Sequence, residues 1–338
     1  MSLSVVELRA SAQWHFPRPY GWKTALAVMV VFAILIFTGH RVEMDRAAVL
    51  TGQAIGIAAG AGGESQVAKG FTAVVGKLFP LQLDERTDID RIAGFDPRDL
   101  PPLAHVETEQ TSTRTLNPET LKLDMVVSHK QVLVQPFGYV IRVAEKMFET
   151  WEIALWGTFL AIIAGLPLAL LGARNLTPAP WIRFASRTLV SLLRAMPELI
   201  TALFLVLAYG FGPIAGVLAL AVHSAGFLGK FYAEDIENAD PKPQEALTAI
   251  GVSRFKMFRF AILPQVMPQY IAYTFYILDR NVRMATVIGL VGAGGIGQEL
   301  KGRYDMYNYG HVGTILVAIF LLVVILDQLS SRLRSTRL

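Results

Sequence analysis

Four ionisable side chains lie in or beside long apolar stretches. Arg280 and Arg283 follow one such stretch, Glu198 lies near the start of another, and His223 lies within a third. A guanidinium forms forked hydrogen bonds to the oxygens of an oxyanion, so the two arginines are candidates for attracting an anion along a pathway. A structural role explains the position of the two arginines equally well. It would be an ion pair with Asp279 or Glu198, or extension of the charged end to the membrane surface. Ionisable residues within membrane helices, such as Glu198 and His223, more often form hydrogen bonds to a neighbouring helix than to a substrate.

A glycine-rich run is the second candidate for chemistry. Gly292, Gly294, Gly295 and Gly297 match G-x-G-x-x-G and follow an apolar, strand-like segment. A dinucleotide site would also need an acidic residue about 20 positions later to bind the ribose. Residues 316–326, in that region, contain no Asp or Glu and resemble a membrane span instead. The other interpretation is that small residues let helices or symmetry-related chains approach closely, either along a gated pathway or simply as packing.

The stretch 240–264 has the pattern of a protein contact. Glu245 and Ala246 lie in a short helical segment, and Gly251 after it can adopt a positive φ. A second short segment, basic and apolar, leads to Leu263 and Pro264. A helix–turn–helix of this size presents a compact knob to a partner, and an ordinary amphipathic loop helix is the alternative.

The composition places these segments in a membrane. Of the 338 residues 53% are hydrophobic and only 17% are charged, against about 25% charged in an average globular chain. The formal net charge is +4, but the basic residues cluster beside apolar runs and form no face interleaved with aromatics, which argues against nucleic-acid binding. The absence of cysteine and the scatter of the six histidines argue against redox and metal sites. No G-x-x-x-x-G-K-[ST] motif occurs, so the chain is not its own P-loop ATPase.

Charge-free stretches predict an all-α integral membrane protein with six transmembrane helices. The predicted spans are residues 24–39, 153–173, two helices between about 188 and 230 that break at 210–213, 260–278, and 306–326. Residues 284–298 are too short to cross a bilayer and are interpreted as a broken or re-entrant segment. Lys and Arg in the short loops place both termini in the cytoplasm.

The same pattern divides the chain into parts of different character. The parts are a cytoplasmic segment (1–23), the first transmembrane helix (24–39), an extracytoplasmic insert (40–150), a core of five spans with the cytoplasmic loop 240–264 (151–330), and a cytoplasmic tail (331–338).

The loop 240–264 resembles the EAA loop of ABC importer permeases, in which E-A-A is followed by three residues, a Gly, nine residues and I-x-L-P. Glu245, Ala246, Gly251, Leu263 and Pro264 fit that spacing, while positions 247 and 261 depart from it mildly. The similarity extends over residues 150–332, and within the ABC importer permeases it is specifically to the phosphonate permease. The stretches that carry it are 193–199, 223–230, 281–287 and 291–300.

This resemblance implies a type I ABC importer permease-like fold in the inner membrane of a bacterium. The chain would be the membrane-spanning subunit of an ATP-driven importer of phosphonate or a related oxyanion, phosphite or hypophosphite. The implied partners are a second copy of the chain, two ATP-binding subunits that hold ATP and Mg, an extracytoplasmic phosphonate-binding protein and membrane lipid. The chain itself would hold no cofactor or metal and catalyse no reaction.

The resemblance also implies roles for the residues singled out above. The five loop residues that fit the EAA spacing would contact the ATP-binding subunit, and the two arginines and four glycines would line the pathway or gate. Two other classes stay open: a membrane-anchored dinucleotide-binding oxidoreductase, and a proton-coupled secondary transporter. The latter would need membrane-embedded relay carboxylates, and Glu198 alone does not make a relay.

Overall fold

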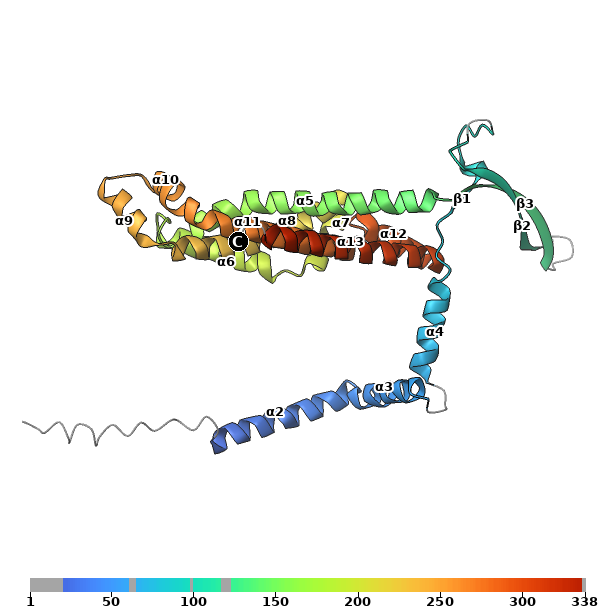
Figure 1. Ribbon diagram of the computed structural model, residues 1–338, viewed down its shortest axis with the longest axis horizontal. Helices are drawn as coiled ribbons and strands as arrows, with labels where there is room; N and C mark the ends of the chain where they lie inside the picture. The colour runs from blue at the N-terminus through green and yellow to red at the C-terminus, as the bar shows by residue number, and fades with distance from the viewer. Residues whose placement is uncertain (1–20, 61–64, 98–99, 117–122, 336–338) are drawn as a thin grey trace, which may run out of the picture. The chain divides into compact units, whose positions relative to one another are not determined.

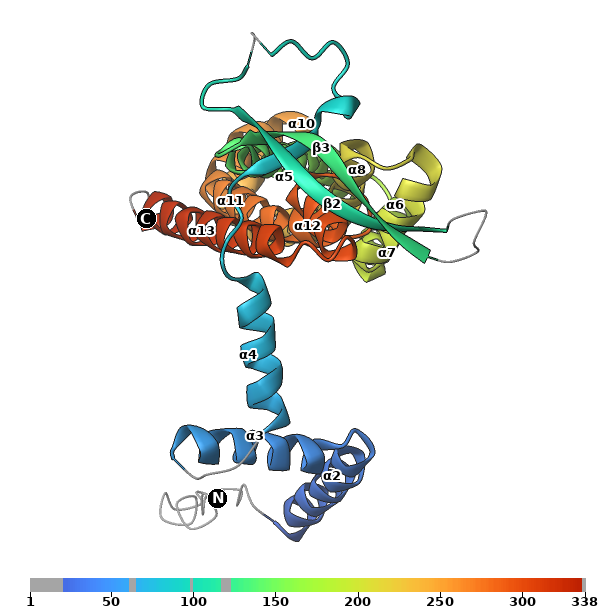
Figure 2. The same cartoon turned by 90° about the vertical axis from the view of Figure 1, so that its right-hand side faces the viewer.

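The computed structural model describes residues 21–60, 65–97, 100–116 and 123–335. The chain forms two compact units, Met1–Gly76 and Lys77–Leu338. The predicted cytoplasmic segment 1–23 and the end of the predicted tail 331–338 lie largely outside the described residues. Helices dominate both units (Figures 1 and 2).

The first unit is built from helices. α2 (Trp22–Arg41) coincides with the predicted first span, and α3 (Met44–Ala58) and α4 (Gln66–Leu78) follow it. None of the α2 side chains is buried, although most are apolar. A helix that is apolar all round and has no protein cover is suited to a lipid environment.

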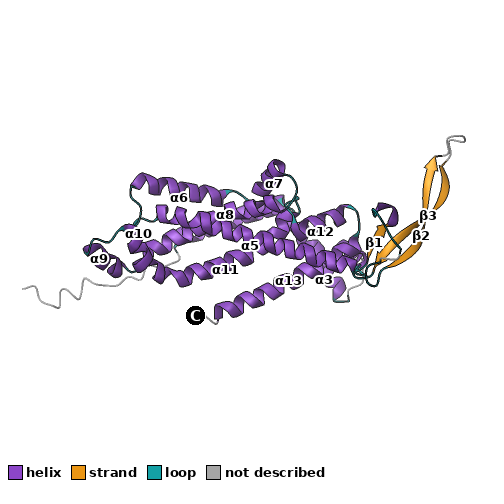
Figure 3. Cartoon of the chain, turned by 90° about the horizontal axis from the view of Figure 1, so that it is seen from above, coloured by secondary structure: helices purple, strands orange, loops and turns teal. Residues whose placement is uncertain are grey.

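The second unit is a helical bundle with a small sheet beyond one end (Figures 1 and 3). The bundle helices are α5 (Gly138–Gly172), α6 (Pro180–Ala195), α7 (Glu198–Tyr209), α8 (Pro213–Asn238), α11 (Leu263–Gly289), α12 (Gly295–Asp305) and α13 (Tyr309–Ser335). α5 and α8 pack along their lengths, with Gly157 against Leu220 and Gly165 against Leu228. Small residues at these points let the two backbones approach closely.

Within the described residues, four helices are long and apolar enough to cross a membrane: α2, α5, α8 and α13. α6 and α7 add a fifth crossing if the bent pair forms a single span. α11 contains the predicted span 260–278 only from Leu263 onward, because a π-helical turn (Phe258–Ile262) precedes it. Three charged residues in its second half, at 279, 280 and 283, lower its hydropathy.

Two predicted boundaries need correction. The helix expected to run unbroken from about 188 to the break at 210 ends at Ala195 and restarts at Glu198, with an 89° bend between the two parts. Pro197 explains the break, since the residue before a proline avoids the helical conformation. α5 begins at Gly138, well before the span start predicted at 153, and its first turns are packed in the core through the buried Tyr139 and Val143. The uncharged stretch 284–298 is broken as predicted: α11 ends at Gly289, and α12 begins at Gly295 after a turn.

The second half of the insert forms an antiparallel sheet, so the expectation of an all-α protein holds for the core and not for the whole chain. The strands are β1 (Glu85–Asp88), β2 (His105–Leu116) and β3 (Leu123–Gln135), in the order β1-β3-β2, and a short 3₁₀ helix (Ile89–Arg91) follows β1. The sheet lies beyond one end of the bundle, whereas α9 (Pro241–Ala249) and α10 (Arg254–Met257) lie at the other end (Figures 1 and 3).

Candidate functional site

A cluster of three ionisable side chains lies where α6 and α7 break. Arg280 on α11 donates to the carboxylate of Glu198, the first residue of α7, and lies 3.0 Å from His223 Nε2 on α8. The side chains of Glu198 and His223 are 5% and 10% exposed, and that of Arg280 is 25% exposed. The structure therefore brings together three of the predicted site residues in a mostly buried ion-pair cluster.

His223 also closes the helix break. Its Nδ1 lies 3.1 Å from the carbonyl oxygen of Met196, which precedes Pro197. A carbonyl can only accept, so Nδ1 carries a proton, and Nε2 lies between Arg280 and Glu198, 3.1 Å from the Glu198 Oε1 atom. The ring of Phe227, one turn along α8, packs beneath the Arg280 guanidinium with 4.8 Å between the ring centroid and Cζ.

A second polar cluster beside this one was not predicted. Asn281, fully buried on α11, accepts from Ser224 Oγ on α8 at 2.9 Å and donates to Thr158 Oγ1 on α5 at 2.9 Å. These bonds join three helices at the level of Arg280. The sequence signal is an amide next to an arginine within an apolar helix, where buried polar groups need partners.

Arg283 lies apart from the cluster. It pairs with Asp279, one turn earlier on the same helix, and its side chain is 45% exposed. The two predicted arginines therefore have different surroundings. Arg280 links three helices through Glu198 and His223, whereas Arg283 is half-exposed and pairs within α11 with Asp279, which is 14% exposed.

The glycine-rich run is a tight turn between α11 and α12. A Cβ at Gly292 would come within 2.2 Å of the Phe211 ring, and one at Gly297 within 2.0 Å of the Thr286 carbonyl oxygen. Gly294 and Gly295 have φ values of +85° and +70°, which disfavour any residue with a Cβ. All four glycines are thus required by close packing and turn geometry.

The N-terminus of α12 is already occupied by side chains of α5. Gly295 N–H donates to Glu149 Oε1 at 2.9 Å, and Ile296 N–H donates to Thr150 Oγ1 at 2.8 Å. In a dinucleotide-binding fold the pyrophosphate takes this position, at the helix N-terminus after a parallel strand. A carboxylate there repels a phosphate, and the sheet of the described residues is antiparallel and remote in sequence. The glycine run is therefore no dinucleotide site.

The predicted contact loop forms a knob at the end of the bundle. α9 ends in a Schellman motif, in which Val252 N–H donates to Leu247 O and Gly251 N–H to Thr248 O. Gly251 has a φ of +76°, the left-handed conformation expected for it. Glu245 is exposed on α9.

The surface of this knob is partly apolar. Ile250 and Phe255 are 74% and 69% exposed, next to the exposed Ala246. Leu263 is half-buried against the core, and Pro264 is exposed in the first turn of α11. An exposed apolar patch with one carboxylate beside it is typical of a protein contact.

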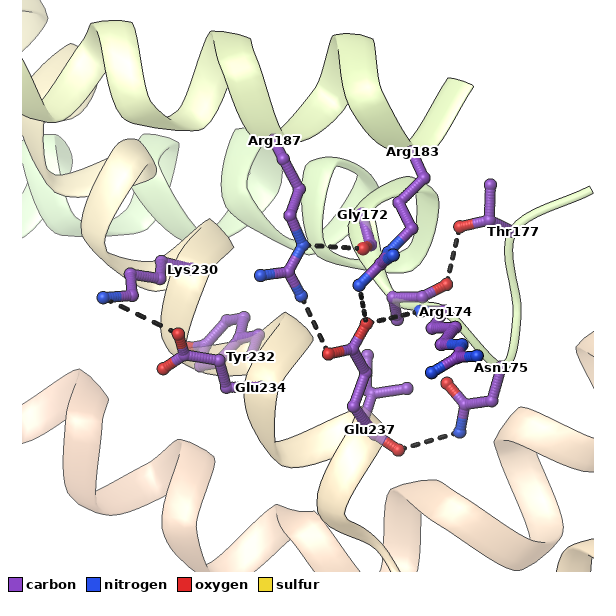
Figure 4. A network of polar contacts seen from close by, with 12 residues as sticks. Gly172, Arg174, Asn175, Thr177, Arg183, Arg187, Lys230, Tyr232, Glu234 and Glu237 are labelled. Carbon is purple, nitrogen blue, oxygen red and sulfur yellow. Dashed lines mark hydrogen bonds and ion pairs between the residues drawn. The ribbon is translucent and has the colours of Figure 1, made fainter. Parts of the chain in front are cut away.

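A polar network fastens this knob to the bundle. Asn175, after α5, donates to the Ile236 carbonyl oxygen and to Gln244 Oε1 on α9 at 2.9 and 3.0 Å. Glu237, near the end of α8, accepts from Arg174 N–H at 2.6 Å and pairs with Arg183 and Arg187 of α6 (Figure 4). Through these contacts, the base of the knob is connected to α5, α6 and α8.

The comparison with protein families decides what this architecture is. Residues 157–334 match the family described as the binding-protein-dependent transport system inner membrane component. The chain belongs to this family. The matched segment begins within α5 and contains the ion-pair cluster, the glycine turn and the knob.

Relatives of this permease carry more specific names. It is 55% identical over 258 residues to the putative phosphite transport system permease protein HtxE of Stutzerimonas stutzeri, which covers 76% of this chain and 99% of that protein. It is 40% identical over 212 residues to the phosphate-import permease protein PhnE of Mycolicibacterium smegmatis, covering 62% of this chain and 40% of the relative.

A solved structure shows the same fold. An inward-facing structure of the MetNI methionine ABC transporter aligns with a TM-score of 0.51 and 21% identity, over 58% of this chain and 96% of that one. The core is therefore a type I ABC importer permease fold.

Proposed function

We propose that this permease is the membrane-spanning subunit of an ATP-driven importer of phosphite or a related phosphorus oxyanion, such as a phosphonate or hypophosphite. The observation that carries the proposal is the 55% identity to a putative phosphite permease over almost its whole length. Phosphate belongs among the candidates too, because a more distant relative is named a phosphate-import permease.

The proposed assembly contains two permease chains, two ATP-binding subunits and an extracytoplasmic binding protein. The second permease is either another copy of this chain or a related chain. The knob around Glu245 and Gly251 would dock the ATP-binding subunit, which would hold ATP and Mg. In support, its surface is exposed and partly apolar, and its base is tied to α5, α6 and α8.

We further propose that the knob end of the bundle faces the cytoplasm and that the sheet faces outward, with six crossings in all. Basic residues follow α5 and α8 at the knob end, as the positive-inside rule requires. The sheet lies beyond the opposite end. ATP-driven closure of the ATP-binding subunits would move the knob, and the bundle helices tied to it would open the pathway outward.

The ion-pair cluster would act on this pathway through Arg280. Glu198 neutralises part of its charge, so Arg280 would guide an anion past without binding it tightly. Arg283 is the weaker candidate for this role, because the carboxylate of Asp279 pairs with it from one turn away on the same helix.

The experiment is uptake by cells that lack their own transporters for these ions. Cells expressing this permease with its ATP-binding and binding-protein subunits are given radiolabelled phosphite, hypophosphite, phosphate or a simple phosphonate. Accumulation of one of these ions, lost when the permease alone is omitted, is the expected result. Complete absence of accumulation for all four ions, with the complex present in the membrane, would refute the proposal.

A further inference from the structure

A small pocket between α5, α6 and α8 is lined by three cationic side chains. Its volume is about 170 Å³, and Arg187, Arg194 and Lys230 lie on its wall. Ser186 and Ser191 of α6 add hydroxyl groups to the lining. The Ser186 hydroxyl donates to the Leu168 carbonyl oxygen, which fixes α6 against α5 on one side of the pocket.

Among the described residues, nearby carboxylates pair with two of the three cations of this pocket and leave the third, Arg194, without one. Glu237 is shared between Arg183 and Arg187, and its Oε2 lies 3.0 Å from Arg187 Nη2. Glu234 lies 3.6 Å from Lys230 Nζ in a half-exposed pair along α8 (Figure 4). Arg194 forms no ion pair with any carboxylate in the described part of the chain.

Arg194 is the side chain that most needs a partner. Its Nε is buried and makes no hydrogen bond, and its guanidinium packs on the face of Phe227, with Cζ 5.0 Å from the ring centroid. Gly226 places the α8 backbone against it, since a Cβ there would come within 2.8 Å of Arg194 Cγ. Burying a guanidinium without an ion-pair partner destabilises the folded protein unless an anion binds to it.

The pocket suits a tetrahedral oxyanion with an apolar neighbour. Guanidinium, ammonium and hydroxyl groups together offer charge-assisted hydrogen bonds to several oxygens. The outer face of α6 is apolar and uncovered, with Trp181, Phe184 and Leu192 exposed by 71%, 75% and 58%. Basic pockets between membrane helices near the cytoplasmic side bind phospholipid head groups in this way.

We propose that the pocket between α5, α6 and α8 binds a phosphate-type oxyanion through Arg194, Lys230 and Arg187. The group comes from one of two sources, the head group of an anionic phospholipid or a free phosphorus oxyanion. The apolar face of α6 favours the lipid, whose acyl chains would cover it. Only the free-ion source rests on the proposed transport function.

The test measures ligand binding, not transport, on the purified complex of the permease with its ATP-binding subunits. In the lipid arm, the complex is placed in nanodiscs of phosphatidylcholine with or without phosphatidylglycerol, and phospholipid retained after detergent extraction is counted by native mass spectrometry. In the free-ion arm, binding of phosphite and phosphate is titrated calorimetrically in a phosphate-free maltoside.

Arg194→Gln and Lys230→Gln remove one pocket charge each, and Arg174→Gln is the matched control. The Arg174 side chain is exposed at the same end of the bundle and does not line the pocket. We expect each pocket variant to weaken binding about tenfold, as the loss of one charged hydrogen bond implies, and the control to bind as the original chain does. Lys230→Gln removes only a half-exposed pair, so its assembly should be normal and its result interpretable.

The two arms separate the sources and can overturn the site. Retention of phosphatidylglycerol that depends on Arg194 and Lys230 assigns the pocket to lipid. Charge-dependent binding of the free ion without lipid retention assigns it to the ion. Binding of neither, or equal loss in Arg174→Gln, overturns the proposal. Because uptake is not measured, these results are independent of the transport assay.

Discussion

Removing the Glu198 carboxylate should destabilise the assembled permease. Glu198→Ala leaves Arg280 without a carboxylate partner, while Arg280 remains three-quarters buried between α7, α8 and α11. Breaking a buried pair from one side costs about 3–5 kcal/mol. The partial exposure of Arg280 places the expected loss at the lower end, about 3 kcal/mol.

An exposed pair on α12 provides a comparison. Lys301→Ala breaks the pair with Asp305 one turn away, whose side chains are 51% and 53% exposed, and the expected loss is below about 1 kcal/mol. The assay is the yield of complex assembled with the ATP-binding subunits and its apparent Tm in detergent. Glu198→Ala should lower both clearly, and Lys301→Ala should leave both almost unchanged.

A double variant separates structural pairing from a pathway role. The double variant Glu198→Ala/Arg280→Ala leaves no buried charge unpaired, so its assembly should recover relative to Glu198→Ala alone. The effects of the two substitutions on stability should therefore be strongly non-additive. Uptake measured on the recovered complex then reports whether Arg280 guides the anion. Equal losses in Glu198→Ala and Lys301→Ala, or no recovery in the double variant, would refute the assignment of Arg280 to a buried pair.

Three further predictions concern the turns and the topology. Gly251→Val forces a β-branched residue to φ +76° at a strain of about 1–3 kcal/mol, so co-purification of the ATP-binding subunit should fall while membrane insertion continues; unchanged co-purification and ATPase activity would contradict this. Gly297→Ala should destabilise by about 1–3 kcal/mol because its Cβ meets the Thr286 carbonyl oxygen, whereas Gly302→Ala on the same helix has open space and should not; a thermal-melting comparison checks the pair. Asp96→Cys, in this cysteine-free chain, should react with an impermeant maleimide added outside spheroplasts, and labelling only after lysis would contradict the proposed orientation.

Apolar spans such as α2 and local turn chemistry could be predicted from sequence. The break at Gly210–Pro213 appears where predicted, with Gly210 and Gly212 at φ +86° and +142°. Gly251 likewise takes a left-handed conformation at the end of α9. In both cases a glycine within a short segment permits the positive φ that the turn needs, so neighbouring residues suffice for the prediction.

Features that depend on distant contacts were missed. The sequence predicts one continuous helix from about 188 to 210, although Pro197 within it signals a break. His223, on another helix, accommodates the break by bonding to the Met196 carbonyl oxygen. The partner of Arg280 was left open between Asp279 and Glu198, because only the packing of α7 against α11 brings Glu198 to it.

The sheet and the occupied N-terminus of α12 were missed for the same reason. β2 and β3 pair over twelve positions, from His105 with Val134 to Leu116 with Leu123, but the polar composition of β2 resembles that of an irregular insert. Glu149 and Thr150 are 146 residues from the backbone groups they bind. No pattern within the glycine run indicates that its helix terminus is already filled.

Uptake into proteoliposomes is the measurement that tests the central claim most directly. The complex of this permease with its ATP-binding subunits is reconstituted with ATP inside, and the binding protein and radiolabelled phosphite are supplied outside. The account predicts phosphite accumulation that requires internal ATP, the binding protein and this permease, and that competing phosphonate or hypophosphite reduces. Reconstituted complex that hydrolyses ATP but accumulates neither phosphite nor any of the related phosphorus oxyanions would contradict it.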